Sequence, residues 1–507
     1  MKKLTPLALA ISLASGAAFA GTENIADVDQ NGDGNTATID QAVSSQDNDA
    51  YIEQDGARNE SSITQSNTAT ALATSMQDGE DNTAEITQKT QTAGSSADIN
   101  TIGNGNAATI TQETYNGDAL ASIEQLGDGN QATIEQNNGD QAISSIYQEG
   151  NGNSATIDNY ISDFANASIE QTSGNSNTAL IDQHNSDGTT AEIRQGLGDA
   201  NDATIKQNTG SYMYGPEGTF ASVDQEGNAN IALIEQGNLA NVATIEQYGD
   251  ANMATINQNA SDDSEATIVQ LDASNTATVT QSGTQQSAFI EQEVEGNSAT
   301  VTQNDNNNIA EVYQSGTTNT ATVDQSNADN YAEVDQDGNG NTATIDQTAS
   351  IAGTASATVN SGNNNTATIT QSGLENDATI VNYGSGANAD ITQTGESNEA
   401  WGGTWGTDTM LTITQTGDNN YAYGDSSSNL SDVDISQLGN ENSANVESWW
   451  GEQNDIDVVQ QGNNLTATVY SNGDFNQVSV NQFESSNQAS VNQYGNGNVA
   501  TITQGQL

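Results

Sequence analysis

The sequence predicts an all-β fold, a β-solenoid of about 21 stacked two-strand rungs whose strands form two parallel sheets. Three observations predict it. A seven-residue motif at 35–41, Asn-Thr-Ala-Thr-Ile-Asp-Gln, recurs with small changes almost to the end of the chain. The Gln that closes each copy recurs at a nearly constant spacing, and a Gly-containing link often joins two copies. Such self-similarity is typical of architectures in which each unit stacks on the next.

The motif has the alternation of a strand rather than of a helix. At a period of two, one face carries Asn35, Ala37, Ile39 and Gln41, and the other face carries two Thr and an Asp. Thr and Ile at alternate positions favour an extended conformation. A single strand of this kind is too short and too polar to be stable alone, so we expect the copies to stack.

The spacing of the strand-closing Gln residues divides the chain. Copies in 21–207 form pairs that repeat every 23 or 24 residues, and copies in 225–507 follow an 11-residue step. Between these two regions, 208–224 is predicted to be an insertion loop. Other residues replace Gln at several steps: Thr101, Asn159, Asn360, Asn382, Thr404, Ser426, Ser448 and Ser471.

The first 20 residues are predicted to be a signal peptide. Lys2 and Lys3 form a charged start, 7–13 is an apolar segment, and 18–20 (Ala-Phe-Ala) is the small-residue cleavage site that precedes Gly21. The apolar segment is shorter than the roughly 20 residues that span a membrane. No later stretch is apolar enough to cross a bilayer, so we expect an exported mature chain that is not membrane-spanning.

Stacking in register would place identical residues in columns along the solenoid. Buried Gln and Asn are expected to pair their amides in ladders, because copies of one amide satisfy each other's donors and acceptors. The ladder and core positions are Gln30, Asn35, Ile39, Gln41, Gln54, Asn59, Gln65, Gln77, Asn82, Ile86, Gln88, Gln125, Asn130, Gln136, Gln247, Asn252, Gln258, Gln336, Asn341, Gln347, Gln493, Asn498 and Gln504. The predicted turn glycines, where φ is expected to be positive, are Gly32, Gly56, Gly79, Gly127, Gly249, Gly338 and Gly495.

Composition limits the functions that the chain can have. Only 33% of its 507 residues are hydrophobic, and its formal net charge is −62. We expect this acidity to oppose association, and salt, low pH or divalent cations to relieve it. The four basic residues beyond residue 20 are too few for nucleic-acid binding. With no Cys and one His, His184, the sequence offers no catalytic constellation, and we predict no enzyme, cofactor or specific metal site.

The repeat Gln-x-Gly-x-x-Asn-x-Ala-x-x-x-Gln, seen at 77–88, 125–136, 247–258, 336–347 and 493–504, resembles the curlin repeat, here in an unusually large number of copies. The resemblance implies a curli fibre subunit, a functional amyloid that stacks head to tail on itself in extracellular fibres for biofilm matrix, adhesion and surface colonisation. It also implies a nucleator subunit, periplasmic chaperones and an outer-membrane secretion pore as partners. Repeats reach to within ten residues of the predicted cleavage site and end at Gln504, so we expect an open strand edge at each end.

The alternative is a monomeric acidic β-solenoid adhesin or surface protein that does not polymerise, with cation binding or ice binding as its variants. Two Thr on the outer face of several strands, as at Thr342 and Thr344, are compatible with ice binding. Such a face should be unbroken, and Glu85, Glu192 and Ala232 argue against it.

Overall fold

The computed structural model describes residues 23–42, 44–90, 92–209, 218–359 and 362–505. The predicted signal peptide at 1–20 lies outside these residues, as do 210–217 of the predicted insertion. The chain divides into two compact units, the first ending at Gly218 and the second beginning at Thr219. All the regular elements of the described residues are β-strands, and this part of the chain contains no helix long and apolar enough to cross a membrane.

The first unit contains 16 strands, which make eight two-strand rungs. Its odd-numbered strands are β1 (Ile25–Asp33), β3 (Asp49–Ala57), β5 (Leu72–Glu80), β7 (Ser96–Asn104), β9 (Leu120–Leu126), β11 (Ile143–Glu149), β13 (Asn166–Gln171) and β15 (Thr190–Gln195). Its even-numbered strands are β2 (Thr36–Ala42), β4 (Glu60–Ser66), β6 (Thr83–Lys89), β8 (Ala107–Glu113), β10 (Gln131–Asn137), β12 (Ser154–Tyr160), β14 (Thr178–His184) and β16 (Asp202–Asn208).

The second unit contains 26 strands, which make 13 rungs. Its odd-numbered strands are β17 (Phe220–Glu226), β19 (Val242–Tyr248), β21 (Glu265–Leu271), β23 (Ser287–Gln292), β25 (Ile309–Gln314), β27 (Tyr331–Gln336), β29 (Thr354–Val359), β31 (Asp377–Asn382), β33 (Glu399–Thr404), β35 (Tyr421–Ser426), β37 (Ser443–Trp449), β39 (Thr466–Asn472) and β41 (Gln488–Tyr494). Its even-numbered strands are β18 (Ile231–Gly237), β20 (Met253–Asp262), β22 (Thr276–Thr284), β24 (Ser298–Asn306), β26 (Thr320–Gln325), β28 (Thr342–Ile351), β30 (Thr366–Leu374), β32 (Asn388–Glu396), β34 (Met410–Thr416), β36 (Asp432–Leu438), β38 (Asp455–Asn463), β40 (Gln477–Ser485) and β42 (Val499–Gln504).

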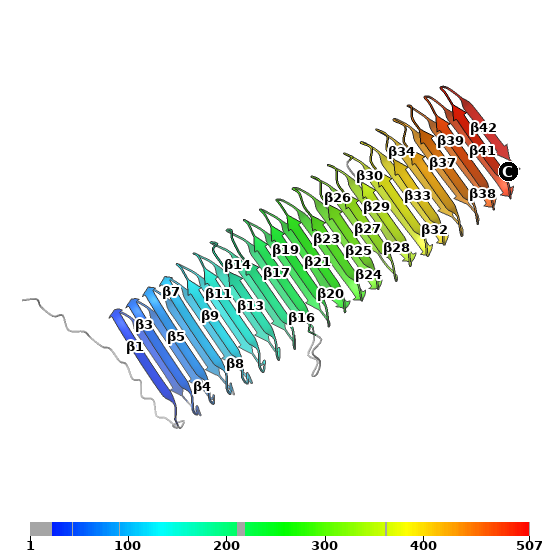
Figure 1. Cartoon of the computed structure of the whole chain (residues 1–507). Helices are drawn as coiled ribbons and strands as arrows, with labels where there is room; N and C mark the ends of the chain where they lie inside the picture. Colours follow the sequence, from blue (N-terminus) through cyan, green and yellow to red (C-terminus); the bar gives the residue numbers. More distant parts are fainter. Residues whose placement is uncertain (1–22, 43, 91, 210–217, 360–361, 506–507) are drawn as a thin grey trace, which may run out of the picture. The chain divides into compact units, whose positions relative to one another are not determined.

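In each unit, odd-numbered strands pair only with odd-numbered strands, and even-numbered with even-numbered (Figure 1). The pairings are parallel and keep one register, as where Ile39 pairs with Ile63, Ile63 with Ile86 and Ile86 with Ile110. Two of them shift register near the strand end, between β20 and β22 and between β28 and β30. A chain that alternates between two parallel sheets in this way is a β-solenoid. The predicted fold class is therefore confirmed.

The seam between the two sheets of each unit is built from the inward face of the motif. Ile63, Ile86 and Ile110 are fully buried, and the Ala two residues before each Ile or Val thins the seam at most rungs. Full burial of an Ile contributes about 1.5–3 kcal/mol. Because the sheets are parallel, each rung supplies the same side chains as its neighbours, and the stabilisation repeats along the unit.

The strand pattern resumes inside the range that the spacing predicts as an insertion. Strand β17 begins at Phe220, and Ala221 and Val223 of this strand are buried at the Ala and Ile positions of the motif. The connection between β16 and β17 is therefore 209–219, which is shorter than the predicted insertion at 208–224. The difference arises because the inward alternation of a strand starts several residues before its closing Gln225.

Candidate functional site

The strand-closing Gln residues form buried ladders along each unit. Gln41 donates from Nε2 to Oε1 of Gln65 at 2.9 Å, and Gln65 donates to Gln88 at 2.9 Å. In the second unit, the even-numbered strands carry an unbroken ladder of 12 such bonds, 2.7–3.0 Å long, from Gln236 to Gln504. Every amide in this ladder donates toward the next rung, so the ladder has a direction.

Each Gln amide also ties its strand to the backbone of the rung. Gln303 accepts from Gln281 at 2.9 Å and donates to Gln325 at 3.0 Å, and its Nε2 also donates to the carbonyl of Ser287 at 2.9 Å. Both amide protons and the carbonyl oxygen are therefore used. A buried amide is stable under these conditions, because leaving any of these groups unpaired would cost about 1–3 kcal/mol.

Gln303→Ala is expected to lower the free energy of unfolding by about 2–4 kcal/mol, since it leaves partners on both neighbouring rungs unpaired and opens a cavity. Urea unfolding followed by circular dichroism measures this. Thr302→Ala, the outward neighbour, is the control and should change stability by less than about 0.5 kcal/mol. Equal effects of the two substitutions would contradict a stabilising role for the ladder.

The ladder of the odd-numbered strands is interrupted. Thr101 follows Gln77 in register, and Oε1 of Gln125 on the next rung has no hydrogen-bond partner among the described residues. In the second unit, residues other than Gln close the odd-numbered strands from β29 to β39: Val359, Asn382, Thr404, Ser426, Ser448 and Ser471. Gln returns at Gln493 in β41. On the same rungs, the even-numbered sheet of this unit thus carries a continuous Gln ladder and the odd-numbered sheet does not.

One predicted substitute for Gln is wrong by one residue. Val359 is in register with Gln336 and is fully buried, whereas Asn360 lies outside the described residues. A shift of one residue exchanges the two faces of a strand. The apolar side chain therefore takes the inward position that the spacing assigned to the amide.

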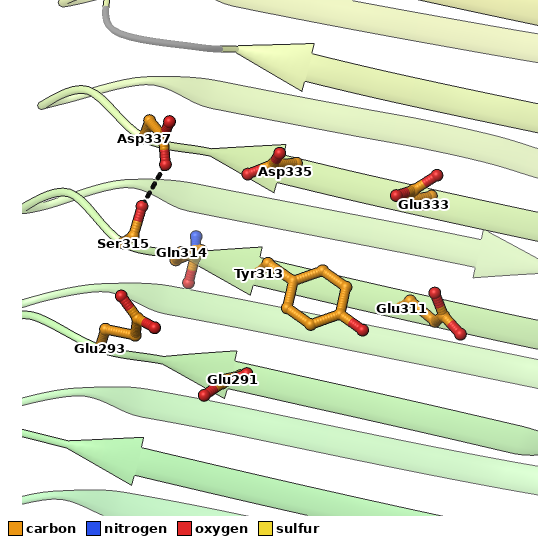
Figure 2. Close-up of a pocket in the computed structure, with 9 residues that line it drawn as sticks. All are labelled: Glu291, Glu293, Glu311, Tyr313, Gln314, Ser315, Glu333, Asp335 and Asp337. Carbon is orange, nitrogen blue, oxygen red and sulfur yellow. Dashed lines mark hydrogen bonds between the residues drawn. The ribbon is translucent and has the colours of Figure 1, made fainter.

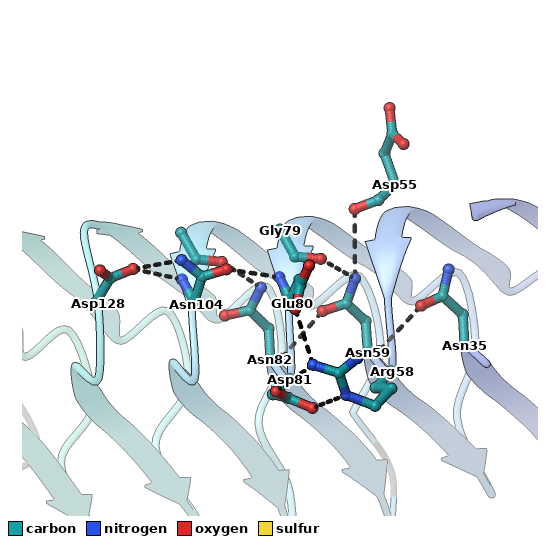
Figure 3. Close-up of polar contacts among 11 residues, drawn as sticks. Asn35, Asp55, Arg58, Asn59, Gly79, Glu80, Asp81, Asn82, Asn104 and Asp128 are labelled. Atoms are coloured by element: carbon teal, nitrogen blue, oxygen red, sulfur yellow. Dashed lines mark hydrogen bonds and ion pairs between the residues drawn. The ribbon is translucent and has the colours of Figure 1, made fainter. Parts of the chain in front are cut away.

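The Asn side chains bond mainly to turn backbone groups, not to each other as predicted (Figure 3). Oδ1 of Asn59 accepts the backbone N–H of Asn82 at 3.0 Å, and its Nδ2 donates to the backbone carbonyl of Gly79 at 2.9 Å. Asn therefore joins the turn backbones of successive rungs, where Gln joins side chains. Some rungs add a direct amide contact, as from Asn398 to Asn376 at 3.0 Å.

The turn glycines are required by close packing between rungs. Gly127 has φ +118°, and a Cβ added there would lie 2.0 Å from the carbonyl oxygen of Gly150. Gly32, Gly56, Gly79, Gly249 and Gly495 also have positive φ. Gly338 lacks a positive φ, but its added Cβ would lie 1.5 Å from the carbonyl oxygen of Gly362. Approach of the next rung's carbonyl, rather than φ alone, therefore explains the column.

The outer faces carry stacked carboxylates. Residues 219–507 contain no Lys, Arg or His, while Arg58 of the first unit pairs with Asp81 at 2.6 Å. An acidic hollow of about 540 Å³ lies on the odd-numbered sheet, where Glu311 and Glu333 are in register. Figure 2 shows the side chains that line it. No group of three or more His, Asp or Glu side chains in the described ranges is arranged to hold a metal ion.

Aromatic side chains gather on the outer face of β33 and β35. Trp401 stacks on Tyr423 with ring centroids 4.5 Å apart and contacts Trp405 at 5.7 Å. Gly403 leaves room for these rings, because a Cβ there would lie 2.3 Å from the ring of Trp405. Trp401 is partly covered by this stacking, whereas Trp450, between β37 and β38, is exposed.

Asp425 is the most deeply buried carboxylate that the structure describes, only 4% exposed. Its burial, with a smaller contribution from Glu447, raises its pKa to about 6, against the hydrogen bond that Ser427 donates. The pair of stacked Asp residues at Asp434 and Asp457 follows the same trend, since burial raises the pKa of each.

Asp425→Asn is expected to stabilise the folded chain near neutral pH and to have little effect near pH 4. The folded carboxyl takes up its proton at about pH 6, above the unfolded value of 3.8. Ionisation therefore opposes folding above about pH 6, and stability is recovered as the pH falls toward about 4. Thermal unfolding at several pH values measures this. The same gain at both ends of the range would contradict it.

The single His of the chain lies on the surface of the first unit. His184 lies at the end of β14 and stacks on Tyr160, with ring centroids 4.6 Å apart, on the outside of the first unit.

Comparison with known proteins identifies one family. The model of the curlin associated repeat matches 21–56, 273–304, 328–359 and 362–395, which include strands of both units. No curated protein matches the chain significantly.

Proposed function

Because this chain is a curlin-repeat protein, we propose that it is a secreted structural subunit that polymerises end to end into extracellular curli-like amyloid fibres. These fibres would serve biofilm matrix, adhesion and surface colonisation. The observation that carries the proposal is the open strand edge at the first and last described rungs.

Residues that are buried in the interior rungs are uncovered at these two edges. In β1, the inward Val28 is 44% exposed, and in β42 the inward Ala500, Ile502 and Gln504 are only partly buried. The interior Val480, one rung before Ile502, is fully buried. An open edge with unpaired backbone groups is a template for another strand.

The two edges are complementary in sequence and in direction. Placing β42 of one molecule on β2 of another aligns Ala500 with Ala37, Ile502 with Ile39 and Gln504 with Gln41, the same matches that join neighbouring rungs. Ladder amides donate toward higher-numbered rungs, so Gln504 would donate across the junction to Gln41. A fibre would then continue the ladder from molecule to molecule.

The partners follow from the family and are part of the proposal. A nucleator subunit would start the fibre, and periplasmic chaperones and an outer-membrane pore would deliver the unfolded chain. Neither nucleic acid nor a cofactor is expected to take part. We also expect no enzymatic activity, since β-solenoids of curlin repeats are structural.

The test is to dilute residues 21–507 from denaturant and follow thioflavin fluorescence, with electron microscopy and fibre diffraction at the plateau. Fibres with reflections near 4.8 Å and 10 Å are expected. Discrete β-rich particles that do not elongate would overturn polymerisation. They would favour the monomeric adhesin instead.

A further inference from the structure

The outer face of the even-numbered sheet has an unusual composition from β22 to β30. Five neighbouring strands of this sheet, β22, β24, β26, β28 and β30, each begin with the outward pattern Thr/Ser-x-Thr-x-Thr/Asp. Of the 15 outward side chains, 12 are Thr, one is Ser, and two are the carboxylates Asp324 and Asp346. In a unit without a basic residue, this face is close to neutral.

The Thr side chains lie on a regular two-dimensional grid. The central column runs in unbroken register through Thr278, Thr300, Thr322, Thr344 and Thr368. Adjacent strands are about 4.8 Å apart, and alternate residues along a strand are about 6.6 Å apart. β-Branched side chains have few χ1 rotamers, so the hydroxyl and methyl groups are held in place before any ligand arrives.

The opposite face of the same rungs shows that strand propensity alone does not explain the Thr. There the outward residues of β23, β25 and β27 include Glu311, Tyr313 and Glu333, which line the acidic hollow (Figure 2). They also include Phe289, whose ring centroid lies 5.5 Å from that of Tyr313. Both sheets are built from one repeat and need the same propensity for strands. The concentration of Thr on one face therefore calls for a reason on that face.

The hydroxyls of this grid are free to bind water. Within the described residues, none of the 12 Thr hydroxyls has a hydrogen-bond partner in the protein. Elsewhere, stacked hydroxyls do find partners, as where Ser145 donates to Ser168 at 3.1 Å and Ser372 to Thr394 at 3.0 Å. A rigid array of unpaired donors and acceptors orders the water that it contacts.

We propose that the outer face of β22–β30 is an ice-binding surface. Thr hydroxyls at fixed spacings hold a layer of water that continues into the lattice of an ice surface, and the methyl groups between them exclude disordered water. A flat repeating ligand suits this face, since small-molecule sites are concave. Sugar rings and proteins are expected to favour aromatic anchors, and the 15 outward positions contain none.

The residues that argue against ice binding in the sequence do not interrupt this face. Glu85 and Glu192 belong to β6 and β15 of the first unit. Ala232 points inward and is buried. End-to-end stacking would leave the sides of the solenoid uncovered, so the inference does not depend on polymerisation.

To test this, a dilute solution of residues 21–507 is frozen slowly, and the fraction of the protein incorporated into the polycrystalline ice is measured. Thermal hysteresis of the same solution is the second readout. The unsubstituted chain is expected to enter the ice. Thr322→Tyr with Thr344→Tyr should abolish both effects, because two rings protrude from the middle of the grid. An unsubstituted chain that stays in the liquid, as an inert acidic protein does, would overturn the proposal.

The matched control is Ser356→Tyr with Thr379→Tyr. These substitutions place two Tyr at adjacent central positions of the odd-numbered sheet without a change of charge. The control should partition like the unsubstituted chain, and circular dichroism should show that both variants keep the fold. Loss of ice binding in the control, or its retention in the Thr322 and Thr344 variant, would also overturn the proposal.

Discussion

Ile502→Lys is expected to stop fibre growth at the end formed by β42. In the free chain this side chain lies at an open edge, where an ammonium group remains hydrated. In the proposed fibre the same position would be buried as Val480 is. Burying an unpaired charge costs several kcal/mol, and a loss of about 3 kcal/mol raises the critical concentration about a hundredfold. Thioflavin kinetics over a concentration series measures this.

Thr501→Lys is the control for that prediction. It adds the same charge to the neighbouring residue of the same strand, but on the outward face. It should polymerise with a critical concentration close to that of the unsubstituted chain. Equal inhibition by both substitutions would mean that added charge, rather than burial at the β42 edge, is responsible.

Gly127→Ala is expected to be the most destabilising glycine substitution in its turn, at more than about 3 kcal/mol. The added methyl group would meet the carbonyl oxygen of Gly150 at 2.0 Å, and backbone atoms cannot move aside as a flexible side chain would. The positive φ adds about 1–3 kcal/mol of strain. Urea unfolding of the full chain, with hydrogen exchange of residues 120–160, locates and measures the loss.

Gly129→Ala is the matched control two residues away. Its φ is +69°, and an added Cβ would have no atom within 4 Å. The same turn position is occupied by Arg58 and Asp81 on other rungs, with φ of 59° and 58°. The expected cost is therefore only about 1 kcal/mol. If both glycines proved equally sensitive, the approach of the next rung would not be the reason for the Gly127 column.

The fold could be predicted because its cause is local and repeated. Alternation within the 35–41 motif fixes the inward face, and constant spacing fixes the register, so Ile39, Ile63 and Ile86 had to form one column if the strands stacked. No long-range information beyond stacking is needed. The same periodicity identifies the residues that close each strand.

What the sequence could not predict depends on contacts between rungs or between sheets. The bond from Asn59 to the carbonyl of Gly79 requires the turn geometry of the following rung. In the second unit, Leu411 stands at an Ala position, and its methyl groups lie within 3 Å of the places where Cβ atoms of Gly402 and Gly424 would be. A larger side chain in one sheet thus fills the space left by two glycines in the other. This compensation can be recognised only when the packing of one sheet against the other is known.

The absence of basic residues from the second unit makes it a polyelectrolyte. Its 37 Asp and Glu residues are spread over 13 rungs. At about 4.8 Å per rung, this is about one charge per 1.7 Å of axis, the linear charge density of double-stranded DNA. Such a density condenses counterions. Adding subunits lengthwise leaves the density unchanged, whereas side-by-side contact raises it. Single filaments are therefore favoured at low ionic strength, and multivalent cations should gather them into bundles.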